Sequence, residues 1–394
     1  MPKVTIFLTS YNHEKYIRES IDSVLNQTYT DFKLIILDDA STDNSWQIIN
    51  SYSDDRIRAY RNEINQLADF PEVFPGEAKG EYIAIHHSDD VWETEKLEHQ
   101  VTFLDQHSEV GAVFTNSTII GEDGQPFTDH THFYYNIFNQ PNRTRHEWLN
   151  YFFFSGNALC HPSLLLRKEC YDKCGQYRDG FYSLPDFDMW VRLCFNYEIY
   201  VLPLKLVRFR VRDNLANTSS ATYENTVRQQ FEYLQILYNY QQISCFDELV
   251  NIFPTAEKFY RSQGSDLEFI LAMIALENSK QWPYHQIFGL QLLFNILQDR
   301  SRANNIKSLY NFDMHDFAKL SAKHDFFSIY SRNKLPEIET QRAQIEMQKA
   351  ENEMLKAENE MLNTENLRIN LSKSWRFTRP FRNITSLIRS LKKY

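Results

Sequence analysis

Two acidic pairs near the start of the chain each follow a short apolar run. Residues 32–39 read FKLIILDD, and residues 82–90 read YIAIHHSDD. An apolar run rich in isoleucine and leucine, bounded by polar residues, is typical of a buried parallel strand. Carboxylates that follow such strands lie where α/β sheets bind ligands. Two acidic groups beside a nucleotide's diphosphate would repel it, so the pattern predicts a divalent cation and nucleotide-sugar chemistry.

Composition and charge narrow the class of protein. The 394 residues suffice for two domains and an appendage, and the 42% apolar content can fill sizeable cores. The formal charge of −10 argues against nucleic acid as a partner, because phosphate binding needs a basic surface. The start of the chain leads directly into a strand-like run, without a signal peptide, and the five cysteines form no CxxC pair. We therefore expect a reduced, cytoplasmic protein.

The first 115 residues alternate strand and helix patterns. We expect strands at residues 4–8, 32–37, 56–60, 82–85 and 112–115. We expect helices at residues 16–27, 45–52 and 93–104. Repeated βα units of these lengths predict an α/β fold with a mostly parallel, doubly wound sheet.

The rest of the chain divides by pattern into four parts. Residues 116–217 mix short strands, one of them at 202–211, with glycine, proline and aromatic residues, and complete a sheet-forming domain over 1–217. A helical region is expected over 218–332, a heptad repeat over 337–371 and a basic amphipathic tail over 372–394.

The heptad repeat predicts a coiled coil that makes a homo-oligomer. The sequence KAENEML occurs at 349–355 and again at 356–362. One seam of residues spaced seven apart contains Leu355, Leu362 and Ile369, and asparagines occupy the companion position. Asparagine at a core position fixes register and favours low oligomer states. A stripe of methionines at 347, 354 and 361 could form the interface in place of this seam. The alternative to a coiled coil is a single exposed helix. The choice between a dimer and a trimer stays open.

The tail combines aromatic and aliphatic residues with lysine and arginine. Trp375 and Phe377 precede Pro380, after which apolar residues recur at helical spacing with cations between them. This pattern is typical of a helix that lies in a membrane interface, where each cation contributes about 1 kcal/mol against anionic lipid. We expect a peripheral membrane contact, with docking on the protein's own acidic body as the alternative.

The acidic pairs suggest a binding site for a nucleoside-diphosphate sugar. One of Asp89 and Asp90 can hold Mn²⁺ or Mg²⁺ while its neighbour hydrogen-bonds the ribose. Asp39 can accept a hydrogen bond from the N3–H of uracil or thymine, which favours UDP or dTDP as the carrier. Thr9 and Tyr11 end the first strand and are expected in the same crevice, with Tyr11 stacking on the base.

Transfer of a sugar to a hydroxyl also needs a general base, because an alcohol is a poor nucleophile at neutral pH. Asp186 and Asp188 are the candidates, at the start of an expected helix where their alternative role is helix capping. His161 and Trp190 are the candidate contacts to the acceptor.

Five segments, in order, resemble the motifs of family-2 glycosyltransferases. Residues 5–12 (TIFLTSYN), 21–28 (IDSVLNQT) and 37–43 (LDDASTD) are similar to the N-terminal signature of that family. Residues 80–92 (GEYIAIHHSDDVW) are similar to its metal motif, and residues 185–193 (PDFDMWVRL) to its acceptor block. The resemblance covers roughly residues 1–215.

The resemblance implies a GT-A fold and an inverting displacement. By position, Asp39 would contact the base, Asp89 the ribose and Asp90 the metal, and Asp186 would deprotonate the acceptor. The family also implies glycan or lipid-linked acceptors of O-antigen or capsule type, at the cytoplasmic face of the inner membrane. The sequence departs from the family pattern at two places. Residues 67–75 lack the arginine that is common there, and Pro185 replaces a glutamate. The second departure leaves both Asp186 and Asp188 open as the base.

The sequence therefore predicts a metal-dependent inverting glycosyltransferase. The alternative is a non-catalytic, degenerate transferase domain that organises a biosynthetic complex through its coiled coil. A dinucleotide-dependent dehydrogenase is excluded because no GxGxxG follows the first strand.

Overall fold

The computed structural model describes residues 1–66, 76–213, 217, 220, 222–277 and 282–371. The chain forms two compact units, Met1–His324 and Asp325–Tyr394, which are described separately. The predicted basic tail at 372–394 lies outside the described residues.

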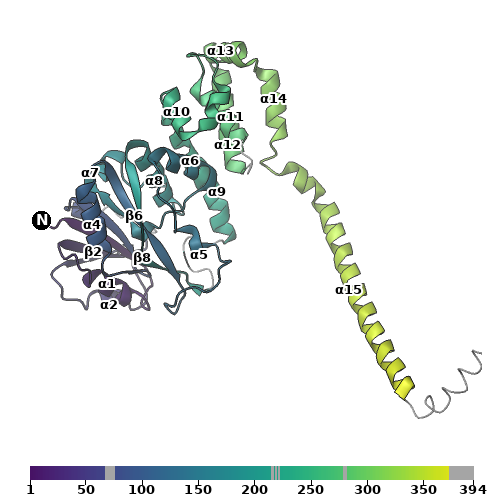
Figure 1. Cartoon of the computed structure of the whole chain (residues 1–394), viewed down its shortest axis with the longest axis horizontal. Coiled ribbons are helices and arrows are strands. Elements are labelled where there is room, and N and C mark those ends of the chain that lie inside the picture. The colour runs from purple at the N-terminus through teal and green to yellow at the C-terminus, as the bar shows by residue number, and fades with distance from the viewer. Residues whose placement is uncertain (67–75, 214–216, 218–219, 221, 278–281, 372–394) are drawn as a thin grey trace, which may run out of the picture. The chain divides into compact units, whose positions relative to one another are not determined.

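The first unit is built on one sheet, which contains eight strands in its described part, in the order β3-β2-β1-β4-β7-β6-β8-β5 (Figure 1). The strands are β1 (Val4–Ser10), β2 (Phe32–Asp38), β3 (Ile57–Arg61), β4 (Tyr82–His87), β5 (Val91–Trp92), β6 (Val110–Ile120), β7 (Leu165–Arg167) and β8 (Glu198–Arg210). All five strands expected in the first 115 residues, and the later one at 202–211, are present with slightly different bounds.

The sheet is mixed, which corrects the expectation of a mostly parallel, doubly wound sheet. β1 pairs in parallel with β2 and β4, β2 with β3, and β6 with β8. β7 is antiparallel to both of its neighbours, and β5 is antiparallel to β8. The physical reason is the short β7, which the chain inserts between β4 and β6 as it returns from the 3-10 helix η1 (His161–Ser163).

Helices cover the sheet and continue beyond it. Those within the sheet-forming part are α1 (Ile17–Leu25), α2 (Ser45–Ile49), α4 (Lys96–Gln106), α5 (Tyr134–Ile137), α6 (Arg145–Ser155), α7 (Lys168–Cys174) and α8 (Pro185–Asn196). Those that follow are α9 (Tyr223–Leu237), α10 (Phe246–Ile252), α11 (Leu267–Leu276), α12 (Pro283–Gln298), α13 (Arg300–Tyr310) and α14 (Met314–Lys323). Figure 1 shows α10 to α13 gathered beyond α6 and α8, where α10 contacts α6 and α12 contacts α9.

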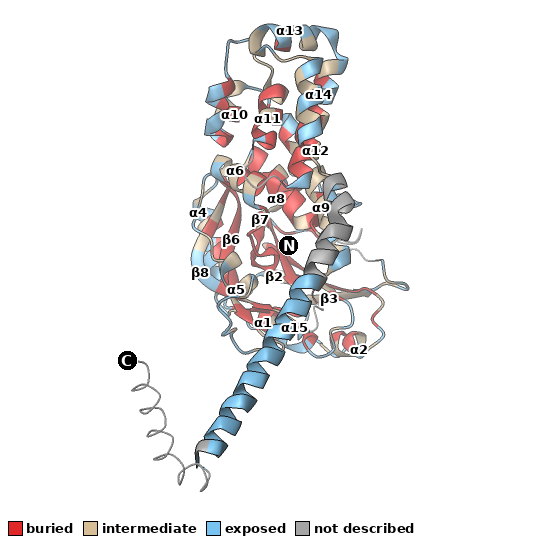
Figure 2. Ribbon diagram, turned by 90° about the vertical axis from the view of Figure 1, so that its right-hand side faces the viewer, coloured by how far each residue is buried: buried red, intermediate tan, exposed pale blue. Residues whose placement is uncertain are grey.

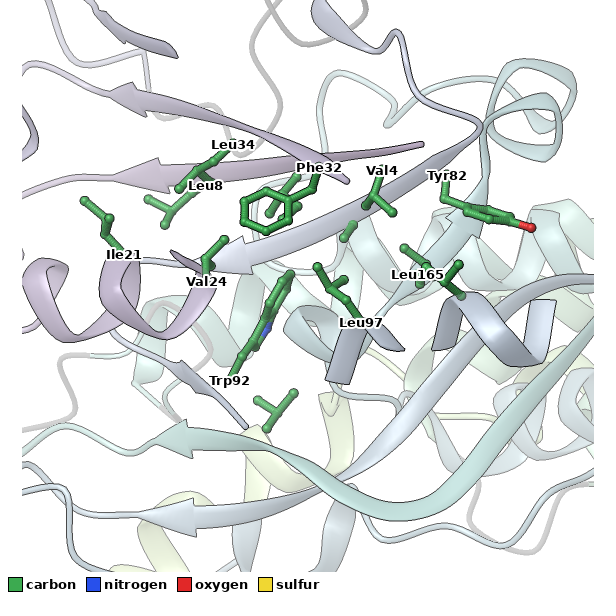
Figure 3. Packing of buried hydrophobic residues seen from close by; sticks show 14 of the residues in the cluster. Val4, Leu8, Ile21, Val24, Phe32, Leu34, Tyr82, Trp92, Leu97 and Leu165 are labelled. Carbon is green, nitrogen blue, oxygen red and sulfur yellow. The ribbon is translucent and has the colours of Figure 1, made fainter. Parts of the chain in front are cut away.

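A large apolar core lies between the sheet and the helices α1 and α4. Val4 and Leu8 of β1 and Leu34 of β2 point toward Val24 of α1 and Leu97 of α4 (Figure 3). Ile17, Ile21 and Val24 recur at helical spacing, so α1 buries one face and leaves the other in solvent. Figure 2 shows the same division, with the buried residues concentrated in the sheet and on the inner faces of its helices.

The parallel strands bring their carboxyl ends to one edge of the sheet. Ser10 at the end of β1 pairs with Asp38 at the end of β2, and Thr9 pairs with His87 at the end of β4. The turns that follow contain Asn12 and Ala40 with φ of 53° and 61°, a left-handed conformation that is strained for residues other than glycine.

Side-chain hydrogen bonds hold these turns together. The backbone N–H of Asn12 donates to Ser41 Oγ at 2.9 Å, and the backbone N–H of Thr42 donates to Asn12 Oδ1 at 2.8 Å. The loops after β1 and β2 are thereby fixed to each other.

The second unit contains the long helix α15 (Ile329–Leu371), whose described side chains begin at residue 344. Leu355, Leu362 and Ile369 are 46–51% exposed, and the methionines at 347, 354 and 361 are 71–74% exposed. Among the described residues, both stripes are about half exposed or more, and the coiled coil stays a prediction. Among the described residues, no helix has the length and apolar character needed to cross a membrane.

Replacement of Ile36 by alanine tests the core. Ile36 is fully buried in β2, and we expect Ile36→Ala to lower the free energy of unfolding by about 2–5 kcal/mol, because it removes packed methyl groups and leaves a cavity. Urea unfolding followed by circular dichroism measures the change. The matched control is Ile64→Ala at a residue that is 71% exposed, which should cost less than about 0.5 kcal/mol. Equal losses in both variants would contradict the assigned burial.

Candidate active site

A cavity of about 590 Å³ opens at the edge where β1, β2 and β4 end. Its walls come from the turns after these strands, from the start of α8 and from α9. The residues expected from the sequence that line it are Thr9, Tyr11, Asp39, Asp89, His161 and Asp186. Segments far apart in the chain therefore contribute carboxylates to one cavity.

Asp39 lines this cavity directly after the end of β2. Its Oδ1 accepts hydrogen bonds from Asn62 Nδ2 at 2.7 Å and from the backbone N–H of Gln66 at 2.9 Å. A carboxylate has about four acceptor positions, so Oδ2, which has a longer contact of 3.2 Å to the same N–H, keeps room for a ligand. Tyr11 is part of the same wall and is partly exposed.

Asp90 lies behind the cavity wall and is almost fully buried. Its Oδ1 accepts the backbone N–H of Arg210 at 2.7 Å, whereas its Oδ2 accepts no hydrogen bond among the described residues. His87 Nδ1 lies 3.4 Å from Oδ2. Burial raises the pKa of Asp90 to about 6, against the lowering effect of His87.

A divalent cation fits this group of residues. His87, Asp89 and Asp90 each offer one ligand atom, and these atoms lie within 4.8 Å of one another. Carboxylate oxygens are the ligands that Mg²⁺ and Mn²⁺ prefer, and a buried oxygen without a hydrogen bond is costly unless a cation or donor satisfies it.

Arg212, just beyond β8, brings a positive charge to the cavity, which the sequence reasoning missed. Its Nε lies 3.2 Å from Asp89 Oδ2, and its Nη1 lies 2.7 Å from His13 Nε2. A guanidinium can only donate, so His13 Nε2 is an acceptor, and the ring proton is on Nδ1, which donates to Ser88 Oγ at 2.6 Å. Burial lowers the pKa of His13, which agrees with a neutral ring.

Asp186 also lines the cavity, from the first turn of α8, where Pro185 starts the helix. Its Oδ2 accepts a hydrogen bond from Asn157 Nδ2 at 2.9 Å, and its Oδ1 accepts the backbone N–H of Phe187 at 2.7 Å. These two donors orient the carboxylate.

Glu232 of α9 holds the segment that precedes Asp186, and the sequence reasoning missed this residue too. It is buried, and its carboxylate accepts backbone N–H groups of Tyr182, Ser183 and Leu184 at 2.7–3.1 Å. The hydrogen bonds fix the backbone from which α8 starts.

Asp188 and Trp190 do not line the cavity. Asp188 is fully buried and forms ion pairs with Arg178 and with Arg192, the latter at 2.8 Å. Trp190 is also fully buried, with its ring 4.9 Å from that of Phe114. Trp190 has no exposed surface in this structure, and its expected contact with an acceptor stays a prediction.

His161 lines the cavity and contacts both His87 and Tyr177. Its Nδ1 lies 3.3 Å from His87 Nε2, and its Nε2 lies 2.9 Å from Tyr177 Oη. Its ring also packs edge-on against Trp190, so the buried tryptophan supports a residue of the wall. Burial lowers the pKa of His161 well below its usual value, which keeps the ring neutral.

Known proteins are similar in sequence to this region. Residues 5–167 match the family model described as Glycosyl transferase family 2. The chain is 29% identical over 228 residues to the O-antigen biosynthesis glycosyltransferase WbnJ of Escherichia coli, which covers 56% of this chain and 84% of WbnJ. It is 39% identical over 106 residues to the E. coli UDP-Glc:alpha-D-GlcNAc-diphosphoundecaprenol beta-1,3-glucosyltransferase WfaP. This alignment covers 27% of this chain and 42% of WfaP.

A solved structure shares the fold over most of both chains. The S. aureus protein TarS 1–349 in complex with UDP-GlcNAc aligns with a TM-score of 0.50 and 18% identity, over 84% of this chain and 92% of that chain. The match to the family over residues 5–167 and the GT-A-like α/β domain agree with each other. Residues 5–167 of the chain are therefore similar to glycosyltransferase family 2.

Proposed function

We propose that the protein is a metal-dependent, inverting glycosyltransferase. It moves a sugar from a nucleoside diphosphate, UDP or dTDP, to a hydroxyl of a saccharide or lipid-linked glycan. The names of WbnJ and WfaP, which refer to O-antigen biosynthesis and to a diphosphoundecaprenol-linked sugar, support a role in surface-polysaccharide synthesis. Such acceptors would place the enzyme at the cytoplasmic face of the inner membrane.

The observation that carries this proposal is the convergence of three carboxylates on one cavity. Asp39 and Asp89 line it from the loops that follow β2 and β4, and Asp186 lines it from the first turn of α8. This arrangement suits a donor and an acceptor that bind in one cavity. A non-catalytic scaffold is the alternative, but it would not need these acids in one open cavity.

On the donor side, the chain's own groups bind the nucleotide. Asp39 Oδ2 accepts the N3–H of the base, Tyr11 stacks on its ring, and Asp89 accepts a hydrogen bond from the ribose. Arg212, beside Asp89, is the residue with a permanent positive charge among the described residues of the wall, and it faces the diphosphate. A divalent cation, Mn²⁺ or Mg²⁺, held by Asp90 would stabilise negative charge on the departing diphosphate.

On the acceptor side, Asp186 acts as the general base. As the acceptor oxygen forms its bond to the anomeric carbon, the bond from that carbon to the diphosphate oxygen breaks, and the hydroxyl proton passes to Asp186. Attack from the face opposite the diphosphate inverts the configuration. Asn157 holds the carboxylate in place, and His161 lies within the same wall to contact the acceptor.

The helix α15 and the tail extend this proposal to assembly and localisation. We propose that the seam of Leu355, Leu362 and Ile369 pairs with a second copy in a coiled coil. The peripheral membrane contact through residues 372–394 stays a prediction from the sequence.

Calorimetric titration with UDP, dTDP, GDP and CDP tests the donor side. Each nucleotide is titrated with Mn²⁺ and again with EDTA. We expect UDP or dTDP to bind about 10- to 150-fold more tightly than CDP, because the charged Asp39 accepts an N3–H that cytosine lacks. Binding should weaken in EDTA. If no nucleotide binds, the scaffold alternative is supported instead.

Two aspartates on α8 provide a matched test of the base. Asp186→Asn should lower the turnover number about 10²- to 10⁴-fold with nucleotide affinity unchanged and a small loss of melting temperature, because the amide takes no proton and can accept only one of the two hydrogen bonds that Asp186 accepts. Asp188→Asn should instead destabilise the fold by about 3–5 kcal/mol, because it breaks a buried ion pair with two arginines. Turnover and thermal unfolding measure both effects. Full activity in Asp186→Asn would show that another group is the base.

Paired substitutions on α15 distinguish the two apolar stripes. Leu355→Asp with Leu362→Asp should convert an oligomer to a monomer in light scattering, because the charges would enter the coiled-coil seam. Met354→Asp with Met361→Asp is the control and should leave the oligomer intact. The opposite result would assign the interface to the methionine stripe. A monomeric wild-type protein would establish α15 as a single exposed helix.

A further inference from the structure

His87 occupies an unusual position for a residue so close to the acidic pair. It ends β4, and its Nδ1 faces the buried Asp90 Oδ2 at 3.4 Å, on the side of the cavity that Asp89 also lines. Asp90 Oδ2 accepts no hydrogen bond among the described residues, so this buried oxygen and the imidazole nitrogen point into the same small space.

The other nitrogen of His87 is held from behind. Its Nε2 lies 3.3 Å from His161 Nδ1, and the two rings meet edge to face with centroids 5.0 Å apart. His161 is fixed in turn by Tyr177 Oη at 2.9 Å and by the buried Trp190. Metal-binding histidines are typically oriented in this way, by a partner on the nitrogen that does not bind the metal.

The kinds of ligand atom at this site determine which metal ion it favours. Mg²⁺ takes oxygen ligands in a near-ideal octahedron. Mn²⁺ also prefers oxygen ligands, but as a first-row transition-metal ion it accepts an imidazole nitrogen more readily than Mg²⁺ does. A site that combines a histidine with carboxylates therefore favours Mn²⁺ over Mg²⁺.

We infer that His87 is a protein ligand of the metal beside Asp90, with an oxygen of Asp89 within reach, and that this nitrogen makes the site select Mn²⁺ over Mg²⁺. The inference rests on the proposed function, because it concerns the cation that the donor site needs. The other role open to His87 is a hydrogen bond that only positions Asp90.

The test is Mn²⁺ and Mg²⁺ binding to the full chain in the presence of UDP, measured by calorimetry, with pulsed electron paramagnetic resonance of the Mn²⁺-loaded protein. Wild type should show coupling between Mn²⁺ and a ¹⁴N nucleus, and should bind Mn²⁺ at least about tenfold more tightly than Mg²⁺. His87→Ala should lose the coupling and bind Mn²⁺ about 10- to 100-fold more weakly, with little change for Mg²⁺. His87→Asp should lose the coupling and bring the two affinities together, because it replaces nitrogen with oxygen.

The control is His99→Ala, at an exposed histidine of α4, which should leave both affinities and the ¹⁴N coupling unchanged. Thermal unfolding of each variant shows that it is folded. If wild type binds Mn²⁺ without ¹⁴N coupling, or if the coupling persists in His87→Ala, His87 is not a ligand and only this inference fails. If wild type with UDP binds neither ion, the metal-dependent function fails as well.

Discussion

Parallel pairing of β1, β2 and β4 aligns the ends of three strands, and the cavity follows from that alignment. The pairing also gathers acidic side chains in a small volume, where their mutual repulsion disfavours the charged forms. Arginines from other strands oppose this repulsion. Arg61 of β3 lies 3.2 Å from the buried Asp38, and Arg212 beyond β8 lies 3.2 Å from Asp89. The sheet thus supplies both the acids and the cations that hold them.

Arg210 at the end of β8 connects the acidic pair after β4 to helix α1. It is buried, its backbone N–H donates to Asp90, its Nε donates to the carbonyl of Asp89 at 2.8 Å, and its Nη2 pairs with Glu19 of α1 at 2.7 Å. A buried guanidinium that lost these partners would be strongly destabilising. The acidic pair after β4 is therefore positioned by a residue about 120 positions later. The arrangement of Asp89 and Asp90 thus depends on the end of β8.

The parts of the fold that the sequence predicted are those set by local pattern. The apolar runs of β1, β2 and β4 and the periodicity of α1 are visible without tertiary information, and the cavity residues Asp39 and Asp89 follow from their places after strands. The strands β5 and β7 contain two and three residues, too few to show a period or a direction, which is why the sheet's mixed character was missed.

Tertiary partners explain most of what was missed at the site. Arg212 and Glu232 act on residues far along the chain, on the side chain of Asp89 and on the backbone before α8. Neither belongs to a motif, and each resembles an ordinary charged residue until the chain is folded. The helical region thus contributes to the site through Glu232, although its sequence pattern carried no recognisable chemistry.

The geometry of α8 explains why only one of its two acids faces the cavity. An α-helix turns about 100° per residue, so Asp186 and Asp188 point about 200° apart around its axis. When Asp186 faces the cavity, Asp188 must face the interior, where a bare carboxylate would be costly without cations. Arg178 and Arg192 meet that need, and Asn239 adds a hydrogen bond at 2.9 Å. The spacing of the two acids therefore separates a carboxylate that lines the cavity from one that forms ion pairs in the interior, a distinction that the residue types alone do not make.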